Sequence, residues 1–239
     1  MKNISELKIK ICADGADINS MLEWQKNPAI KGFTTNPTLM YKAGIKNYEI
    51  FAKEILDVIK DKPVSFEVLS DDFSEMQRQA LKIASWGKNV YVKIPIVNTA
   101  GKSSVDLIKT LAHEGVKQNV TAVMTLEQVR AATEALQESP AAIISVFAGR
   151  IADTGRDPVP VMRKAFNIMH PYPQLELLWA SSRELFNIFQ ANEAGCHIIT
   201  VAHDLLKKLD LVGKDLQKLT LETVKTFYDD AMKAGLSLP

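Results

Sequence analysis

The chain of 239 residues has a formal net charge of +1, with 46% hydrophobic and 24% charged residues. This balance suits a globular protein with one large core, and it offers no basic run or acidic tail for nucleic acid and no apolar stretch long enough for a membrane. The two cysteines exclude a disulfide framework, and the first residues lack the apolar segment of a signal peptide. We therefore expect a cytoplasmic protein that binds neither nucleic acid nor membrane.

Short apolar strands alternate with helical stretches along the whole chain. The expected strands are 7–13, 31–36, 64–68, 89–94, 116–123, 142–147, 175–180 and 197–201. The expected helices are 18–25, 48–59, 73–86, 101–113, 126–137, 160–169, 184–194 and 203–209, with a last helix at about 219–234. Eight strand–helix pairs predict an α/β fold: a (β/α)8 TIM barrel, one domain over residues 1–239, with an extra C-terminal helix. A doubly wound open sheet is the alternative, but the Gly-rich phosphate loop usual after its first strand is absent here.

A lysine stands in the middle of the apolar strand 89–94. Because strand side chains alternate between two faces, Val90, Val92 and Ile94 point one way while Tyr91 and Lys93 point the other. A buried ammonium is costly unless it is paired, and desolvation favours the neutral amine, which can attack a carbonyl. A solvated lysine on an edge strand is the simpler interpretation of Lys93 alone.

The same alternation, applied to the other strands, brings polar groups to one inward face. The inward residues are expected to be Asp14, Thr34, Asn36, Glu67, Asn119, Thr121, Ser145, Phe147, Trp179 and Ser181. In a barrel these side chains meet at the C-terminal mouth, where barrel enzymes keep their active sites. Seven strands in register, with a lysine and two carboxylates among them, favour a catalytic site over a solvated edge.

The inward lysine and its two carboxylates suggest Schiff-base chemistry on a carbonyl substrate. Lys93 would attack the carbonyl, and Asp14 or Glu67 would take a hydroxyl proton during carbon–carbon cleavage. Hydroxyl and amide side chains on the same face suit a polyhydroxylated substrate. The site needs no metal, and the four histidines show no metal-ligand spacing.

Two arginines follow adjacent strands. Arg150 comes after the sixth strand and Arg183 after the seventh, with Ser181 and Ser182 beside Arg183. Each arginine alone could form a surface ion pair, but together they favour a phosphate site.

At these residues the chain resembles the transaldolase family. The matching segments run in unbroken order from the first strand to the seventh: Ala13-Asp14-Gly15-Ala16-Asp17, Thr34-Thr35-Asn36-Pro37, Phe66-Glu67-Val68, Val92-Lys93-Ile94-Pro95, Asn119-Val120-Thr121, Ile144-Ser145-Val146-Phe147-Ala148-Gly149-Arg150-Ile151 and Ala180-Ser181-Ser182-Arg183. The combination of Thr-Thr-Asn-Pro, the lysine strand and Gly-Arg-Ile is specific, whereas any single segment would be weak.

The resemblance implies a role for each matched residue. Lys93 looks like the Schiff-base lysine, Asp14 like the general acid and base, and Glu67 with Thr121 like the pair that positions a water. The dihydroxyacetone unit would be held by Asn36, Asn119 and Ser145, and the phosphate by Arg150, Ser181 and Arg183. The family moves a dihydroxyacetone unit from a ketose phosphate to an aldose phosphate without cofactor or metal. Sugar phosphates are therefore the expected partners, and homo-oligomers are expected from the family.

Three activities stay open at this stage. Glu67 and Phe147 are similar to the transferring branch, because the fructose-6-phosphate aldolase branch has Gln and Tyr there. An aldolase that releases dihydroxyacetone, and a binding protein that has lost catalysis, are the alternatives. Trp179 and Ser182 depart from the family pattern, and an inward Trp179 would narrow the pocket and allow a sulfonated or deoxy sugar. The last helix would cover the mouth or pack on a neighbouring subunit.

Overall fold

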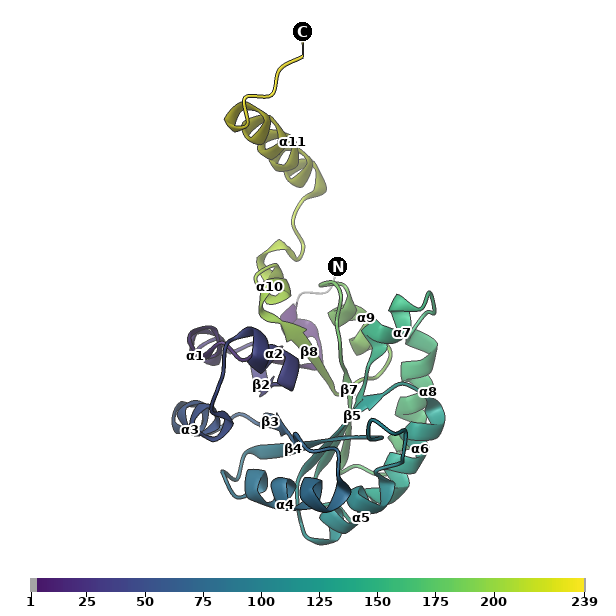
Figure 1. Ribbon diagram of the computed structural model, residues 1–239. Helices are drawn as coiled ribbons and strands as arrows, with labels where there is room; N and C mark the ends of the chain where they lie inside the picture. Colours follow the sequence, from purple (N-terminus) through teal and green to yellow (C-terminus); the bar gives the residue numbers. More distant parts are fainter. Residues whose placement is uncertain (1–3, 239) are drawn as a thin grey trace.

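Eight parallel strands close into a barrel in the computed structural model, which describes residues 4–238 (Figure 1). The strands are β1 (Lys10–Asp14), β2 (Ile30–Thr34), β3 (Val64–Glu67), β4 (Val90–Pro95), β5 (Gln118–Val123), β6 (Ala142–Val146), β7 (Leu175–Trp179) and β8 (Ile198–Ala202). Their order around the barrel is their order in the chain, and β1 pairs with β8 to close it. The predicted (β/α)8 barrel is confirmed.

Helices follow the strands, and all but the last of them form a layer around the outside of the barrel. They are α1 (Ile18–Gln25), α2 (Pro37–Lys42), α3 (Tyr48–Val58), α4 (Phe73–Ala84), α5 (Val105–His113), α6 (Leu126–Ala135), α7 (Ala148–Asp153), α8 (Val159–Met169), α9 (Asn187–Glu193), α10 (His203–Leu206) and α11 (Leu216–Lys233), with 3-10 turns η1 (Ile4–Glu6) and η2 (Leu209–Leu211). None of the helices in the described part of the chain is both long and apolar enough to cross a membrane.

Two short helices, α2 and α7, were not predicted. Asn36 caps α2 by accepting a hydrogen bond of 2.9 Å from the backbone N–H of Leu39, and Pro37 takes the first helical position. An asparagine followed by proline is a common helix start, so this pair marks α2 in the sequence. By contrast, α7 begins without a side-chain cap, so its sequence carries no comparable signal.

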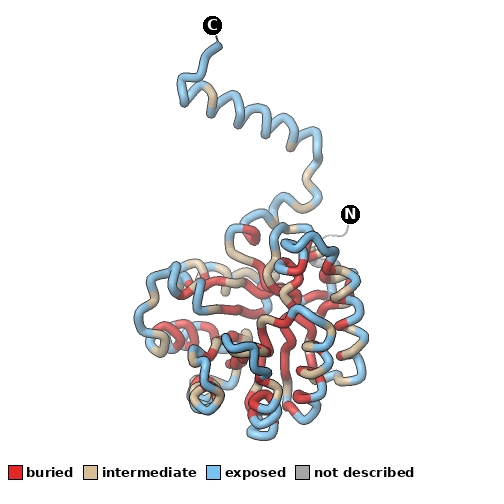
Figure 2. Tube along the Cα trace, turned by 45° about the vertical axis from the view of Figure 1, so that its right-hand side comes forward, coloured by how far each residue is buried: buried red, intermediate tan, exposed pale blue. Residues whose placement is uncertain are grey.

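Two apolar clusters separate the inside of the barrel from its outer layer. The larger cluster joins the outward strand residues to the helices, and the smaller one fills the barrel interior with Cys12, Ile143, Leu178, Ala180 and Ile198. Buried strands therefore occupy the centre of the molecule, inside a ring whose outer surface is exposed (Figure 2).

The expected orientation of strand seven was wrong. Trp179 is only 1% exposed, but it belongs to the outer cluster, while Leu178 and Ala180 face the interior. The error came from extending the alternation beyond the strand. β7 ends at Trp179, and Ser181 has a φ of +63°, a left-handed conformation that breaks the period of two.

The last helix, α11, stands clear of the barrel (Figure 1). None of its residues is buried, and large apolar side chains are exposed on it: Leu216, Leu221, Val224, Phe227, Tyr228 and Met232. In Figure 2 most of this helix is coloured as exposed, and none of it as buried. The expectation that the C-terminal helix covers the mouth of the same barrel does not hold in this structure, which places no α11 residue at the pocket.

We expect Trp179→Ala to lower the free energy of unfolding by about 3–5 kcal/mol, because it removes a large side chain from the outer core. Urea unfolding at neutral pH measures this change. The matched control is Phe186→Ala, which truncates an aromatic side chain that is 59% exposed and should change stability by no more than about 0.5 kcal/mol. Equal effects of the two variants would contradict the burial of Trp179.

Candidate active site

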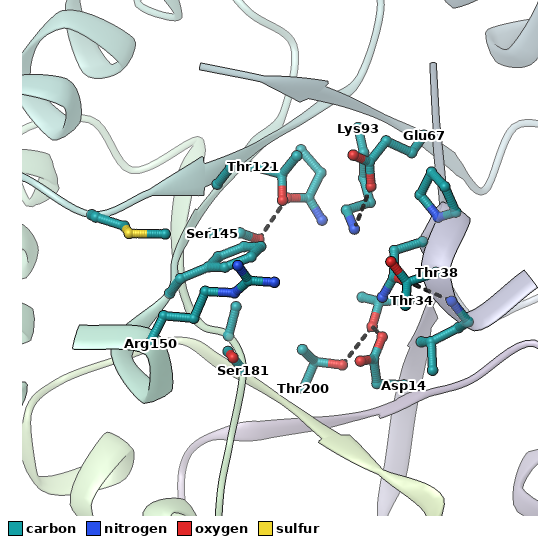
Figure 3. Close-up of a pocket in the computed structure, with 18 residues that line it drawn as sticks. Asp14, Thr34, Thr38, Glu67, Lys93, Thr121, Ser145, Arg150, Ser181 and Thr200 are labelled. Carbon is teal, nitrogen blue, oxygen red and sulfur yellow. Dashed lines mark hydrogen bonds and ion pairs between the residues drawn. The ribbon is translucent and has the colours of Figure 1, made fainter. Parts of the chain in front are cut away.

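A pocket of about 440 Å³ opens at the C-terminal ends of the strands (Figure 3). Every strand, or the turn directly after it, contributes to its lining: Asp14, Thr34, Asn36, Pro37, Thr38, Leu39, Glu67, Lys93, Asn119, Thr121, Ala122, Met124, Ser145, Phe147, Arg150, Ala180, Ser181 and Thr200. This volume falls within the usual range for sites that bind small molecules. The pocket contains eleven of the twelve site residues that the sequence predicted.

Lys93 lies at the floor of the pocket, paired with a carboxylate. Its side chain is 8% exposed, and its Nζ atom lies 3.0 Å from Oε2 of Glu67 and 2.9 Å from the backbone oxygen of Thr35. The parallel register of β3 and β4 places Glu67 directly beside Lys93. The polar environment that a buried lysine requires is therefore built into neighbouring strands.

Asp14 ends β1 on the opposite side of the pocket from Arg150 (Figure 3). Its Oδ1 atom accepts a hydrogen bond of 2.6 Å from the hydroxyl of Thr34. Burial raises the pKa of the Asp14 carboxyl above its ordinary value, and the positive charge of Lys93 and the Thr34 hydrogen bond oppose that rise. A carboxyl with a raised pKa inside a pocket is suited to accept and return a proton.

Amide and hydroxyl groups form a buried network on the next strands. The hydroxyl of Ser145 donates to Oδ1 of Asn119 at 2.6 Å, and the Asn119 amide donates to the Ser65 hydroxyl at 3.1 Å. These bonds fix which face of Asn119 is the acceptor.

Thr121 lies inward by alternation with Asn119, and an irregularity in β5 adds its neighbour Ala122 to the same surface. The register with β6 shifts between Val120 and Val123, and Ala122 has a φ of +59°, so Thr121 and Ala122 both line the pocket. The Thr121 hydroxyl is buried and has no hydrogen-bond partner among residues 4–238. A buried hydroxyl without a partner at a pocket wall is a site for a water or a substrate group.

Arg150 and Ser181 lie side by side across the pocket from Glu67, and Thr200 lies between Ser181 and Asp14 (Figure 3). The guanidinium carbon of Arg150 is 5.6 Å from the centre of the Phe147 ring, so the cation rests over an aromatic face. Gly149 brings the two residues together: a Cβ atom there would lie 1.5 Å from the backbone oxygen of Ser181. Only glycine permits this approach of α7 to the turn after β7.

Arg183, by contrast, does not line the pocket. Its guanidinium forms an ion pair with Asp153 of α7, and about half of its side chain is exposed. The predicted role of Arg183 at a phosphate therefore requires it to leave Asp153.

Thr200 lines the pocket and was not among the predicted site residues. It lies on β8, where alternation places Ile198 and Thr200 on the inward face, so the signal was present. Thr38, Leu39 and Met124 also line the mouth, but they follow strand ends, where alternation carries no information. No group of three or more histidine, cysteine or acidic side chains within the described part of the chain could hold a metal.

The fold and this pocket define a class: TIM-barrel proteins with a buried lysine–carboxylate pair at the C-terminal mouth. A family model described as Transaldolase/Fructose-6-phosphate aldolase matches residues 11–238. The chain belongs to this family, and the predicted resemblance is confirmed.

Relatives of this chain carry consistent names. A "Probable transaldolase" of Thermoanaerobacter sp. (strain X514) is 32% identical over 231 residues, which cover 96% of this chain and 100% of that protein. A "Probable transaldolase 2" of Listeria monocytogenes is 34% identical over 202 residues, covering 84% and 88%. A solved structure titled "QR15, an Aldolase" aligns with a TM-score of 0.55 at 17% identity, covering 87% of this chain and 97% of that one. The last comparison supports the fold alone.

We expect Asp14→Asn to stabilise the protein at pH 7 but not at pH 3. A pKa that is higher in the folded than in the unfolded state means that ionised Asp14 destabilises the fold, and this cost disappears as pH falls below the unfolded pKa. The gain at pH 7 is about 1.4 kcal/mol for each unit by which the pKa is raised. Denaturant unfolding of both proteins at the two pH values measures it. An asparagine variant that is less stable than wild type at pH 7 would contradict the prediction.

Proposed function

We propose that this protein is a transaldolase that transfers a dihydroxyacetone unit through a Schiff base at Lys93. The donor is a ketose phosphate such as sedoheptulose 7-phosphate or fructose 6-phosphate, and the acceptor is an aldose phosphate. The observation that carries the proposal is the position of Lys93, which is buried at the floor of a polar pocket. Its Nζ atom lies 3.0 Å from Oε2 of Glu67, and Asp14 lines the same pocket. A protein that only binds sugars has no need of a buried strand lysine.

Schiff-base formation begins with the loss of a proton from Lys93. Oε2 of Glu67 is the carboxylate oxygen paired with Nζ and is placed to accept that proton. The neutral amine then adds to the ketose carbonyl, and water leaves to give an iminium. The unpartnered Thr121 hydroxyl is the group in the pocket wall that can hold this water during formation and hydrolysis of the iminium.

Carbon–carbon cleavage follows from the iminium. Asp14 takes the proton of the substrate hydroxyl beyond the bond that breaks, and the electron pair of that bond moves to the iminium nitrogen. The first aldose leaves, and the enamine that remains on Lys93 attacks the carbonyl of the second aldose. Asp14 then returns its proton to the new alkoxide. Asn119 and Ser145, fixed by their mutual hydrogen bond, present polar groups to the dihydroxyacetone hydroxyls.

The substrate anion is assigned to the wall formed by Arg150 and Ser181. Arg150 contributes a guanidinium and Ser181 a hydroxyl, and the two lie side by side across the pocket from Glu67. This arrangement supports a phosphate at one end of an extended sugar chain with the carbonyl at Lys93. Trp179 lies outside the pocket, so the reason for expecting a sulfonated or deoxy sugar falls away.

Transfer is preferred over simple aldol cleavage because of Phe147 and Glu67. Phe147 lines the pocket without a hydroxyl, so this position offers no proton donor to the bound enamine. Release of free dihydroxyacetone, the reaction of an aldolase, is the second candidate. The family and its pocket chemistry also support a role in pentose phosphate metabolism, and two buried free cysteines suit a reducing cytoplasm.

We expect incubation with fructose 6-phosphate and borohydride to attach a three-carbon unit to Lys93. Reduction traps the Schiff base, because it converts the bond from Nζ to carbon into a stable amine. Intact mass spectrometry followed by peptide mapping locates the adduct. Lys93→Ala should carry none, and Lys117→Ala, which removes a lysine outside the pocket, should behave like wild type. If wild type forms no adduct with either fructose 6-phosphate or sedoheptulose 7-phosphate, the proposal is overturned.

Product analysis then separates the two reactions. With fructose 6-phosphate alone, a transaldolase stops after one turnover, because the three-carbon unit stays on the enzyme. Adding erythrose 4-phosphate should restore turnover at least tenfold and form sedoheptulose 7-phosphate. Steady release of dihydroxyacetone without acceptor would instead identify the aldolase activity.

We also propose that the protein is a homo-oligomer held together through α11. The helix exposes apolar side chains that its own barrel does not cover, including Phe227, which is 68% exposed. Exposed apolar surface of this extent on one helix indicates a protein partner, and a second copy of the chain is the partner always present.

We expect wild type to be an oligomer in light scattering after size exclusion, and Phe227→Lys to shift it towards a smaller species. The lysine places a charge in the apolar face and so disfavours burial. Thr226→Lys is the control, because residue 226 lies on the polar side of the helix by its 3.6-residue period. A monomeric wild type at micromolar concentration would contradict the proposal.

A further inference from the structure

A short relay of hydroxyls leads from β8 to Asp14. The Oγ1 atoms of Thr200 and Thr34 are 2.5 Å apart, and the Thr34 hydroxyl lies 2.6 Å from Oδ1 of Asp14. Thr200 therefore reaches the carboxylate only through Thr34. Figure 3 shows the three side chains in this order along one wall of the pocket.

The direction of donation follows from counting protons. Each threonine hydroxyl has one proton to donate, and an ionised carboxylate can only accept. If the Thr34 proton goes to Asp14, the short Thr34–Thr200 contact requires the proton of Thr200. The opposite direction would need a protonated Asp14, and it would leave the Thr200 hydroxyl without an acceptor among residues 4–238.

Thr200 is held rigidly in this relay. Its side chain is 6% exposed, and its backbone oxygen accepts a hydrogen bond of 3.0 Å from the hydroxyl of Ser182, in the turn after β7. The strand register adds a second constraint, since Thr200 pairs with Cys12 and Ala202 with Asp14. Ser182, a departure from the family pattern, thus acts on the backbone that carries Thr200.

We propose that Thr200 is a positioning residue for Asp14, donating to Thr34 so that the Thr34 hydroxyl is committed to the ionised Asp14 carboxylate. The other carboxylate oxygen, Oδ2, is then the oxygen left for the substrate proton, whose bond to the substrate hydroxyl breaks as the bond to Oδ2 forms. This inference rests on the proposed role of Asp14 as base. It adds that the pKa of this base depends on Thr200, an uncharged residue that contacts Asp14 only through Thr34.

Charged groups outside the relay also affect the pKa of Asp14. Lys93 on β4 and Glu67 on β3 act on Asp14 with opposite signs. On the neighbouring strands β2 and β8, the pocket-lining residues Thr34 and Thr200 are uncharged, and His203 of α10 lies against Gly15. Because the charges of Lys93 and Glu67 are unchanged in a Thr200 variant, an effect of that variant on Asp14 reports the relay.

The test is a carbon-13 carboxyl titration of Asp14 by nuclear magnetic resonance, with the signal assigned through Asp14→Asn. A donated hydrogen bond stabilises the ionised form, and donation by Thr34 is strengthened when Thr34 itself accepts. Thr200→Val should therefore raise the pKa of Asp14 by about half a unit to one unit. Thr200→Ser keeps the hydroxyl and should stay within about 0.2 units of wild type, while Thr34→Val, which removes the direct donor, should show at least the shift of Thr200→Val.

An unchanged Asp14 pKa in Thr200→Val would overturn the proposal, and so would equal shifts in Thr200→Val and Thr200→Ser. Should Thr200→Val fold poorly, Thr200→Ala removes the same hydroxyl without adding volume, and the same two outcomes apply. In kinetics, the acid limb of kcat/KM should move to higher pH in Thr200→Val and return in Thr200→Ser. A residue that only fills space would lower stability without moving this limb.

The titration needs no substrate, so it separates this proposal from the proposed function. A Thr200 effect on Asp14 together with failed trapping at Lys93 would remove the transaldolase proposal and keep the relay. Successful trapping with an unmoved Asp14 pKa would do the reverse.

Discussion

The buried pairing of Lys93 with Glu67 is the constraint on which the rest of the site depends. An ammonium inside a barrel is tolerable only when a carboxylate and further acceptors surround it, and here the register of β3 and β4 supplies Glu67 while β2 leads to the Thr35 carbonyl. Three adjacent strands must therefore keep their alignment for one side chain to be accommodated. The same alignment places both groups of the ion pair in the pocket at the C-terminal ends of the strands.

Departures from regular strand geometry occur at two other places around the pocket. The left-handed conformations at Ala122 and Ser181 are the two among non-glycine residues in the described chain, and both lie at the pocket. At Ala122 the irregularity brings Thr121 and its neighbour to the same surface, and at Ser181 it turns a residue inward after an outward tryptophan. Strained backbone at these positions is consistent with a site that places functional groups at the expense of regular pairing.

Alternation along the strands predicted the barrel and most of the site because both follow from the period of two. Asp14, Glu67, Lys93 and Ser145 lie within or at the end of regular strands, and all four were placed correctly in the pocket. Alternation gave a wrong prediction at the end of β7, where it placed Trp179 on the inward face. Arg183 was grouped with Arg150 by its place in the sequence, but a long side chain on a turn can reach several partners, and Asp153 is the one it contacts.

The close approach of Gly149 to the Ser181 carbonyl limits which parts of the pocket can change independently. A side chain at 149 would collide with backbone, which cannot rotate away, so α7 cannot shift without rebuilding the turn after β7. The relative positions of Arg150 and Ser181 are thus fixed by this contact. Met124, in the turn after β5, and Leu39, in α2, line the same pocket without such a contact. A change at either of these residues therefore leaves the contact between α7 and the turn after β7 intact, whereas a side chain at residue 149 does not.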